Sequence, residues 1–236
     1  MESYTDKLST TRRVEALGDA VFAIAMTILI LGFAVPVPHA VNNGQALNDY
    51  LLKLVPRIEN YIAAFLVLGY LWIGHHNQFR FIKRTSIILL WINILFFCVI
   101  SIVPFTCNLS GTFPRHVGAS VIFTTNLLLG WIILLIHWLY ATSHPELMEE
   151  KMDSLIAKGG SYRVAIIVFI FVMAVFAALL KFRYALYIYI ALPFVLPWLG
   201  RTVIFKKFLK DEMTGKDEAP AEPDEQNVKE PPDPRE

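Results

Sequence analysis

The chain has 236 residues, of which 56% are hydrophobic and 17% are charged, and its mean hydropathy is +0.51. This composition is too apolar for a soluble domain of the same length, so it predicts an integral membrane protein. The formal net charge is only +1, which by itself says nothing about nucleic-acid partners, and no such partner is expected for a membrane protein of this kind.

Apolar residues gather in six runs, each able to supply the roughly 20 residues that a helix needs to cross a bilayer. The predicted spans are residues 14–34, 57–79, 85–108, 117–140, 162–180 and 184–204. Residues 1–13 are polar, and no signal peptide precedes the first span. We therefore expect an all-α membrane protein with six transmembrane helices, and the lipid bilayer as its surroundings.

Lysine and arginine predict the orientation of these spans. With both termini on the cytoplasmic side, sixteen of these residues fall on that side and five fall outside. Because positive residues are enriched in cytoplasmic loops, this asymmetry favours two cytoplasmic termini. Residues 35–56 then form an outer loop, and residues 141–161 form an inner loop with room for a short helix.

The last part of the chain differs from the rest in composition. Residues 211–236 hold ten acidic residues, three basic residues and five prolines, with few apolar side chains. Such a segment is predicted to be a disordered acidic cytoplasmic tail. The predicted organisation is a cytoplasmic N-terminus (1–13), a six-helix transmembrane domain (14–210) and this tail (211–236).

The first span carries a carboxylate, Asp19, in its entrance turns. A charge near hydrocarbon costs on the order of 2.5–3.5 kcal/mol, so Asp19 needs a partner or a function. Further along, one helix face repeats Ile24, Thr27, Ile28 and Leu31. This stripe is able to line a pathway, and ordinary helix packing is the alternative. Asp19 lies about 100° or more from the centre of the stripe and is expected to face its own subunit.

Further polar residues lie at the height of Asp19, about one turn above the cytoplasmic ends of their spans. The predicted cluster consists of Arg13, Asp19, Trp72, His75, His76 and Asn93. Its simplest interpretation is structural, because polar groups in lipid must find partners. A proton relay or pH sensor is the second interpretation, since histidine titrates near neutrality.

A metal site is not predicted, because the other histidines are expected in loops or elsewhere in the bilayer: His39, His116, His137 and His144. An enzyme is not predicted either. The chain has no nucleophile elbow around its membrane serines, no glycine-rich phosphate loop and no paired-cysteine zinc signature. It also lacks a Thr-Val-Gly-Tyr-Gly filter, which excludes a conventional potassium channel.

Three motifs resemble the transmembrane protein 175 family of potassium channels. The family hallmark is Arg-x-x-x-Phe-Ser-Asp, which here reads Arg13-Val-Glu-Ala-Leu17-Gly18-Asp19, with Leu17 and Gly18 in place of Phe and Ser. The second span has the family's Gly-x-x-Trp-x-x-His-His core, and the third has Asn93 followed by Pro104-Phe105-Thr106. The resemblance covers the first three spans well and the last three mainly by hydropathy.

This resemblance implies a potassium-permeable channel of the bacterial single-repeat branch, in the plasma membrane, assembled as a homotetramer. The first helix of each copy would line the pathway. Ile24, Ile28 and Leu31 would form an apolar constriction, and Thr27 a ring of hydroxyl groups implicated in selectivity. No cofactor is implied, and potassium is the permeant ion.

Two other functions stay open at this point. One is a proton-linked secondary transporter in which Asp19 and His75 or His76 relay the proton, although we find no convincing inverted repeat between the two halves of the chain. The other is a scaffold or sensor without transport, in which the acidic tail is the working part.

Overall fold

The structure is a computed structural model that describes residues 9–33, 44–149, 154–180 and 191. They all belong to one compact unit, Met1–Pro193, whereas the second unit, Phe194–Glu236, lies outside the described residues. The sixth predicted span and the acidic tail therefore lie outside the described part of the chain as well.

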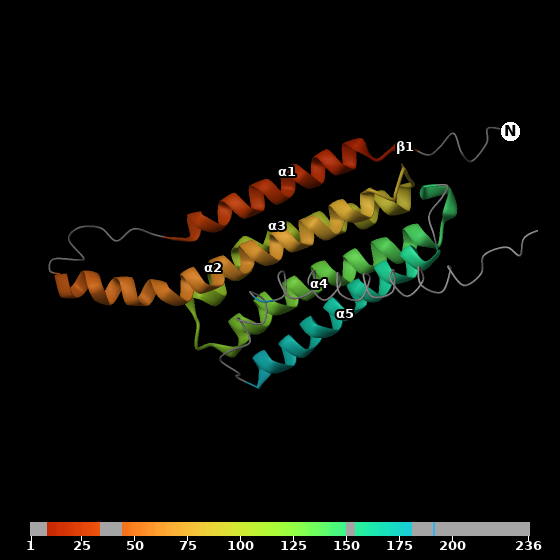
Figure 1. Cartoon of the computed structure of the whole chain (residues 1–236). Helices are drawn as coiled ribbons and strands as arrows, with labels where there is room; N and C mark the ends of the chain where they lie inside the picture. Colours follow the sequence, from red (N-terminus) through yellow and green to blue (C-terminus); the bar gives the residue numbers. More distant parts are fainter. Residues whose placement is uncertain (1–8, 34–43, 150–153, 181–190, 192–236) are drawn as a thin grey trace, which may run out of the picture. The chain divides into compact units, whose positions relative to one another are not determined.

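The described residues form an all-helical bundle with a small two-stranded pairing (Figure 1). The long helices are α1 (Arg12–Ile28), α2 (Gly44–Phe79), α3 (Ile87–Thr112), α4 (Val117–Thr142) and α5 (Ser154–Leu179). Two short 3₁₀ helices are η2 (Leu29–Gly32) and η4 (Pro145–Leu147), and the strands are β1 (Ser9–Thr10) and β2 (Arg84–Thr85). Helix α3 packs against α1, α2 and α4, and α4 packs against α5.

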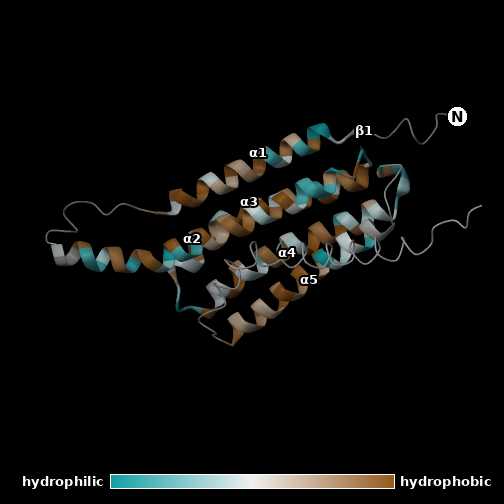
Figure 2. Cartoon of the chain, in the orientation of Figure 1, coloured by the Kyte–Doolittle hydropathy of each residue, from teal (hydrophilic) through white to brown (hydrophobic). Residues whose placement is uncertain are grey.

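Four helical segments are long and apolar enough to cross a membrane: Arg12–Gly32, Ile87–Thr112, Val117–Thr142 and Ala157–Leu179. They correspond to four of the predicted spans. The predicted span 57–79 lies within α2, which is not among these four. Figure 2 shows hydrophilic residues at the start of α1 and hydrophobic residues along much of α3, α4 and α5.

Helix α2 is longer than predicted, because Gly44–Pro56 is helical and was assigned to the outer loop. Pro56 has no N–H to donate, yet it does not end the helix. The Asn60 side chain donates to the Pro56 carbonyl at 2.8 Å. Residues 44–55 therefore extend α2 beyond the predicted membrane span.

Helix α3 begins at a side-chain cap and has a proline in its interior. Ser86 is its N-cap, and its hydroxyl accepts from the Leu89 N–H at 3.3 Å. Pro104 removes one donor from the middle of the helix. Close by, Asn126 of α4 donates to the Val99 carbonyl at 3.0 Å and accepts from the Thr106 hydroxyl at 2.8 Å. These buried hydrogen bonds join α3 to α4.

Backbone pairing joins helix ends at one end of the bundle, the end that is predicted to be cytoplasmic. Strand β1 pairs antiparallel with β2, with Ser9 opposite Thr85. Ile82 forms a bridge with Met148 in the segment that follows η4. The start of α1, the α2–α3 connection and the α4–α5 connection are thus held together, which positions the polar residues just above them.

Candidate functional site

Helix α1 has one face inside the bundle and one face outside it. The buried face consists of Val14, Gly18, Phe22 and Ala25, with Leu29 of η2 continuing it. The predicted stripe lies on the exposed side: Ile24 is 58% exposed, Ile28 43% and Leu31 77%. Three large aliphatic side chains on one helix are therefore left without cover by the described part of their own chain.

Thr27 lies on the same exposed side. Its hydroxyl donates back along the helix, with the carbonyls of Ala23 and Ile24 both at 2.9 Å. A hydroxyl has one donor and two acceptor lone pairs. Because the proton is used within the helix, the lone pairs of the Thr27 oxygen remain for an outside partner such as a cation.

An open groove of about 490 Å³ runs beside the stripe, between α1 and α3. Its α1 wall includes Ile24 and Ile28, and its α3 wall includes Pro104 and Phe105. Phe105 is 67% exposed. The stripe and the groove form one continuous, mostly apolar surface on this side of the chain.

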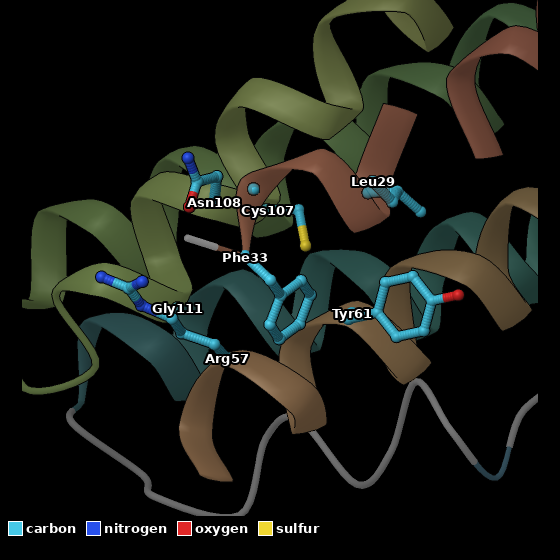
Figure 3. A pocket seen from close by; sticks show the side chains of 8 residues that line it. Leu29, Phe33, Arg57, Tyr61, Cys107, Asn108 and Gly111 are labelled. Atoms are coloured by element: carbon cyan, nitrogen blue, oxygen red, sulfur yellow. The ribbon is translucent and has the colours of Figure 1, made fainter. Parts of the chain in front are cut away.

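A much smaller cavity lies at the far end of α1 (Figure 3). Its volume is about 10 Å³, which suffices for about one water molecule. Phe33 meets Tyr61 edge to face there, with ring centroids 5.7 Å apart. Arg57, Asn108 and Gly111 also line it. This contact ties the end of η2 to α2.

The polar cluster begins at Asp19, whose carboxylate accepts from the indole N–H of Trp72 at 2.8 Å. Trp72 stacks on His76, with ring centroids 5.6 Å apart. Asp19 and His76 are exposed, and Trp72 is 37% exposed. Arg13 is exposed as well and forms no hydrogen bond or ion pair with any described residue. The structure thus joins α1 to α2 through Asp19 and leaves Arg13 outside this contact.

His75 and Asn93 form a second, buried contact between α2 and α3. The His75 Nε2 atom lies 2.9 Å from the Asn93 Oδ1 atom. The Asn93 amide nitrogen donates to the Leu89 carbonyl at 2.8 Å, so its oxygen is the acceptor and His75 Nε2 is the donor. Phe96 stacks on the imidazole with the ring centroids 5.3 Å apart.

The sequence analysis missed two members of this region, Gln78 and His137. His137 was expected elsewhere in the bilayer, yet its ring centroid lies 5.9 Å from that of His75. The His137 Nδ1 atom is 2.6 Å from the Gln78 Oε1 atom, and the Gln78 amide nitrogen donates to the Leu134 carbonyl at 3.0 Å. His137 Nε2 is buried without a hydrogen-bond partner among the described residues.

A signal for His137 was present in the sequence. It lies about one turn from the inner end of the fourth predicted span, which is also the height of His75 in the second. The height of a residue along its helix does not show which helices are neighbours. In the structure α2 and α4 are neighbours, and they approach closely because Gly74 of α2 has no side chain. A Cβ atom there would lie 2.9 Å from Leu134 Cδ2.

These side chains make a scaffold of neutral hydrogen bonds with one exposed carboxylate. In the described part of the chain, no three His, Cys, Asp or Glu side chains gather as a metal site requires. The arrangement holds four helices together at one height and places Asp19 on the exposed side of α1.

The comparisons with known proteins agree with the motifs. The model of the family described as endosomal/lysosomal potassium channel TMEM175 matches residues 13–104. A protein of Streptomyces collinus that is named a potassium channel is 31% identical over 164 residues, which cover 67% of this chain and 78% of the relative. The chain belongs to the TMEM175 family. A second TMEM175 relative, also named a potassium channel, from Chamaesiphon minutus, is 30% identical over 61% of this chain and 72% of the relative.

Other comparisons extend this result. TMEM175 of Danio rerio, named an endosomal/lysosomal proton channel, is 25% identical over 89% of this chain and 41% of its own length. The crystal structure of a lysosomal potassium-selective channel TMEM175 homolog from Chamaesiphon minutus matches with a TM-score of 0.69. The match covers 80% of this chain and 96% of the homolog, with 23% sequence identity, and shows that the two proteins share a fold. The relatives are named as ion channels rather than enzymes, in agreement with the sequence analysis.

Proposed function

We propose that this TMEM175 protein is a potassium-permeable channel in the plasma membrane of a bacterium, formed by four copies of the chain around α1. The exposed stripe of α1 is the observation that carries this proposal. Isolated apolar side chains are common on any membrane protein, since lipid covers them. A stripe that also presents the Thr27 oxygen is better suited to a pathway than to lipid.

In the proposed pathway, Ile24, Ile28 and Leu31 form successive apolar layers. Such a constriction gates by losing its water when it is narrow. Thr27 lies between the first two of these layers, with its proton bonded inside the helix. Four such oxygens would replace part of the hydration shell of a potassium ion and favour it over sodium.

The polar cluster has a supporting role in this proposal. Arg13, Asp19, Trp72, His75, His76 and Asn93 lie toward the inner ends of α1, α2 and α3. Buried polar contacts between membrane helices stabilise their packing because lipid provides no alternative partner. The contacts of Asp19 with Trp72 and of His75 with Asn93 would hold α1 at a fixed position on α2 and α3.

The test is potassium flux from liposomes that contain the purified full-length protein, under a potassium gradient without a pH gradient. We compare the wild type with Ile24→Asn and Thr27→Ala, and use Ile166→Asn on an exposed face of α5 as the matched control. Potassium flux that changes in both α1 variants and not in the control supports the channel. Intact tetramers without flux in any variant would contradict it.

The second candidate is proton-linked transport with Asp19 and His75 or His76 as the relay. This candidate is supported by the names of vertebrate relatives, which are called proton channels. Flux that requires an imposed pH gradient would select this function over a passive potassium channel.

A further inference from the structure

Helix α2 is longer than a membrane crossing requires. Its 36 residues span about 54 Å at 1.5 Å per residue, whereas the hydrocarbon core of a bilayer is about 30 Å thick. Helix α3, with 26 residues and a length of about 39 Å, already crosses that core, and it ends beside Arg57 of α2, which Gly111 approaches closely. Figure 1 shows the first turns of α2 extending past the ends of α1, α3 and α4. Residues 44–55, the α2 extension, therefore lie beyond the reach of the lipid chains.

One face of the α2 extension is apolar and continues into the membrane part of the helix. Its apolar residues recur at alternating intervals of four and three, and this α2 seam consists of Leu47, Leu51, Leu54, Ile58 and Tyr61. The interval averages 3.5 residues, which is the heptad repeat by which helices pack together in coiled coils. By the helical period the charged residues of the extension, Asp49 and Lys53, lie on the opposite side, where water solvates them.

The α2 seam is covered by its own chain at one end only. Tyr61 meets the ring of Phe33, which follows η2, edge to face with the centroids 5.7 Å apart. Farther out, Leu47 is 45% exposed and Leu51 is 50% exposed. In the described part of the chain, no side chain of the α2 extension is buried. Apolar surface in water is unfavourable, so this part of the seam is suited to a protein partner.

The direction of the α2 seam favours a second copy of this chain as that partner. Because Tyr61 meets Phe33, the seam lies on the side of α2 where α1 and η2 end. In the proposed channel α1 borders the central axis, so beyond η2 the seam of each copy faces that axis. The seam carries no charge, and identical copies meet there without repulsion. A heptad seam packs on a helix, whereas residues 34–43, which join η2 to α2, contain Pro36 and Pro38, which disfavour one.

We propose that the α2 seams of neighbouring copies pack together as a short coiled coil on the outer side of the membrane, above the end of α1. This inference rests on the proposed channel of four copies, because the seam has two heptads, fewer than the roughly three to four of an independent coiled coil. The membrane domains hold the extensions at a high effective concentration, so the short seam is sufficient. Ions then enter the outer mouth from the side, between neighbouring α2 helices.

Disulfide cross-linking of the full-length protein in liposomes tests this contact. Leu51→Cys places a thiol in the seam, and Leu52→Cys is the matched control, since Leu52 is 70% exposed and lies outside the heptad positions. Both variants carry Cys98→Ser, which removes the exposed native thiol. With copper phenanthroline as the oxidant, we expect the Leu51→Cys band to shift from monomer to dimer on a non-reducing gel and the Leu52→Cys band to stay monomeric. Equal shifts in both variants would overturn the proposal.

The stability of the assembly gives a second, independent measurement. Leu51→Asn should lower the detergent concentration at which the tetramer dissociates, whereas Leu52→Asn should leave it unchanged. Light scattering on the wild type separates this inference from the function on which it rests. A wild type that is not a tetramer would overturn the proposed channel and the coiled coil with it.

An intact tetramer without the Leu51→Cys cross-link would overturn the coiled coil alone. Labelling with a water-soluble maleimide then shows what covers the seam instead. A labelled Leu51→Cys thiol would mean that water surrounds the seam. A protected thiol that does not cross-link would assign the seam to another cover, such as residues 34–43, and either result contradicts the proposal.

Discussion

The two faces of α1 have different surroundings. On the buried face, Gly18 and Phe22 lie inside the bundle, and the ring centroids of Phe22 and Phe96 of α3 are 5.8 Å apart. On the other face, Ile24, Ile28 and Leu31 are exposed beside an open groove. The buried face is completed by its own chain, whereas the exposed face presents a surface to something else. The same helix is thus an anchor on one face and, in our proposal, a pathway on the other.

The largest expected difference between the two faces is in stability, which Phe96 and Phe105 of α3 test, because the first packs on the buried face of α1 and the second lines the groove. Phe96→Ala removes a ring that is 1% exposed and in contact with His75 and Phe22. We expect a loss of about 3–5 kcal/mol in the free energy of unfolding, as for other buried Phe→Ala changes. Phe105→Ala on the groove should cost about 0.5 kcal/mol or less in a single chain. Unfolding titrations in detergent measure both losses, and equal losses would remove the distinction between the two faces.

The next largest losses in the free energy of unfolding are expected at the buried contact between the Gln78 amide and the His137 imidazole. His137→Leu leaves the Gln78 oxygen without its donor, which should cost about 1–3 kcal/mol. Gln78→Leu should cost a similar amount for the same reason. Because the double variant removes both polar groups, its loss should be well below the sum of the two. Additive losses in a double-mutant cycle would show that the contact between α2 and α4 carries no coupling.

Asp19 tests the boundary between the two faces, because it is exposed and yet bonded to α2. Asp19→Ala removes the acceptor of Trp72 and should lower the yield of assembled protein, at a cost of about 1 kcal/mol, the value of a typical hydrogen bond. Asp19→Asn retains an acceptor oxygen and serves as the matched control. Size-exclusion chromatography and reversal potentials measure assembly and selectivity. A fully assembled Asp19→Ala protein with altered selectivity would place Asp19 in the pathway instead.

The smallest expected effect on the fold is at Thr27. Thr27→Ala should change stability by about 0.5 kcal/mol or less, since the side chain is exposed. It should nevertheless reduce the preference for potassium over sodium, which reversal potentials measure. Thr27→Ser keeps the hydroxyl and should keep the preference. Unchanged selectivity in Thr27→Ala would remove the proposed role of the hydroxyl ring.

The sequence alone determined the family and most of the fold. Long apolar runs predict membrane helices because the bilayer requires internally bonded backbone, and four of these runs are helices long and apolar enough to span. The Arg13–Asp19 motif and the Trp72–His76 core are enough to indicate the TMEM175 family without the tertiary structure. The stripe on α1 also follows from sequence, since helical period alone puts Ile24, Ile28 and Leu31 on one face.

Only the tertiary structure decided which polar residues meet. Arg13 and Asp19 belong to one motif, yet Asp19 accepts a hydrogen bond from Trp72, whereas Arg13 forms no hydrogen bond or ion pair with either residue. His137 and Gln78 are 59 residues apart and form one of the closest contacts of the buried region. A sequence gives the height of a residue along its helix, whereas contact also depends on which helices are neighbours and how closely they approach. Gly18 and Gly74 set those approaches through the side chains that they lack.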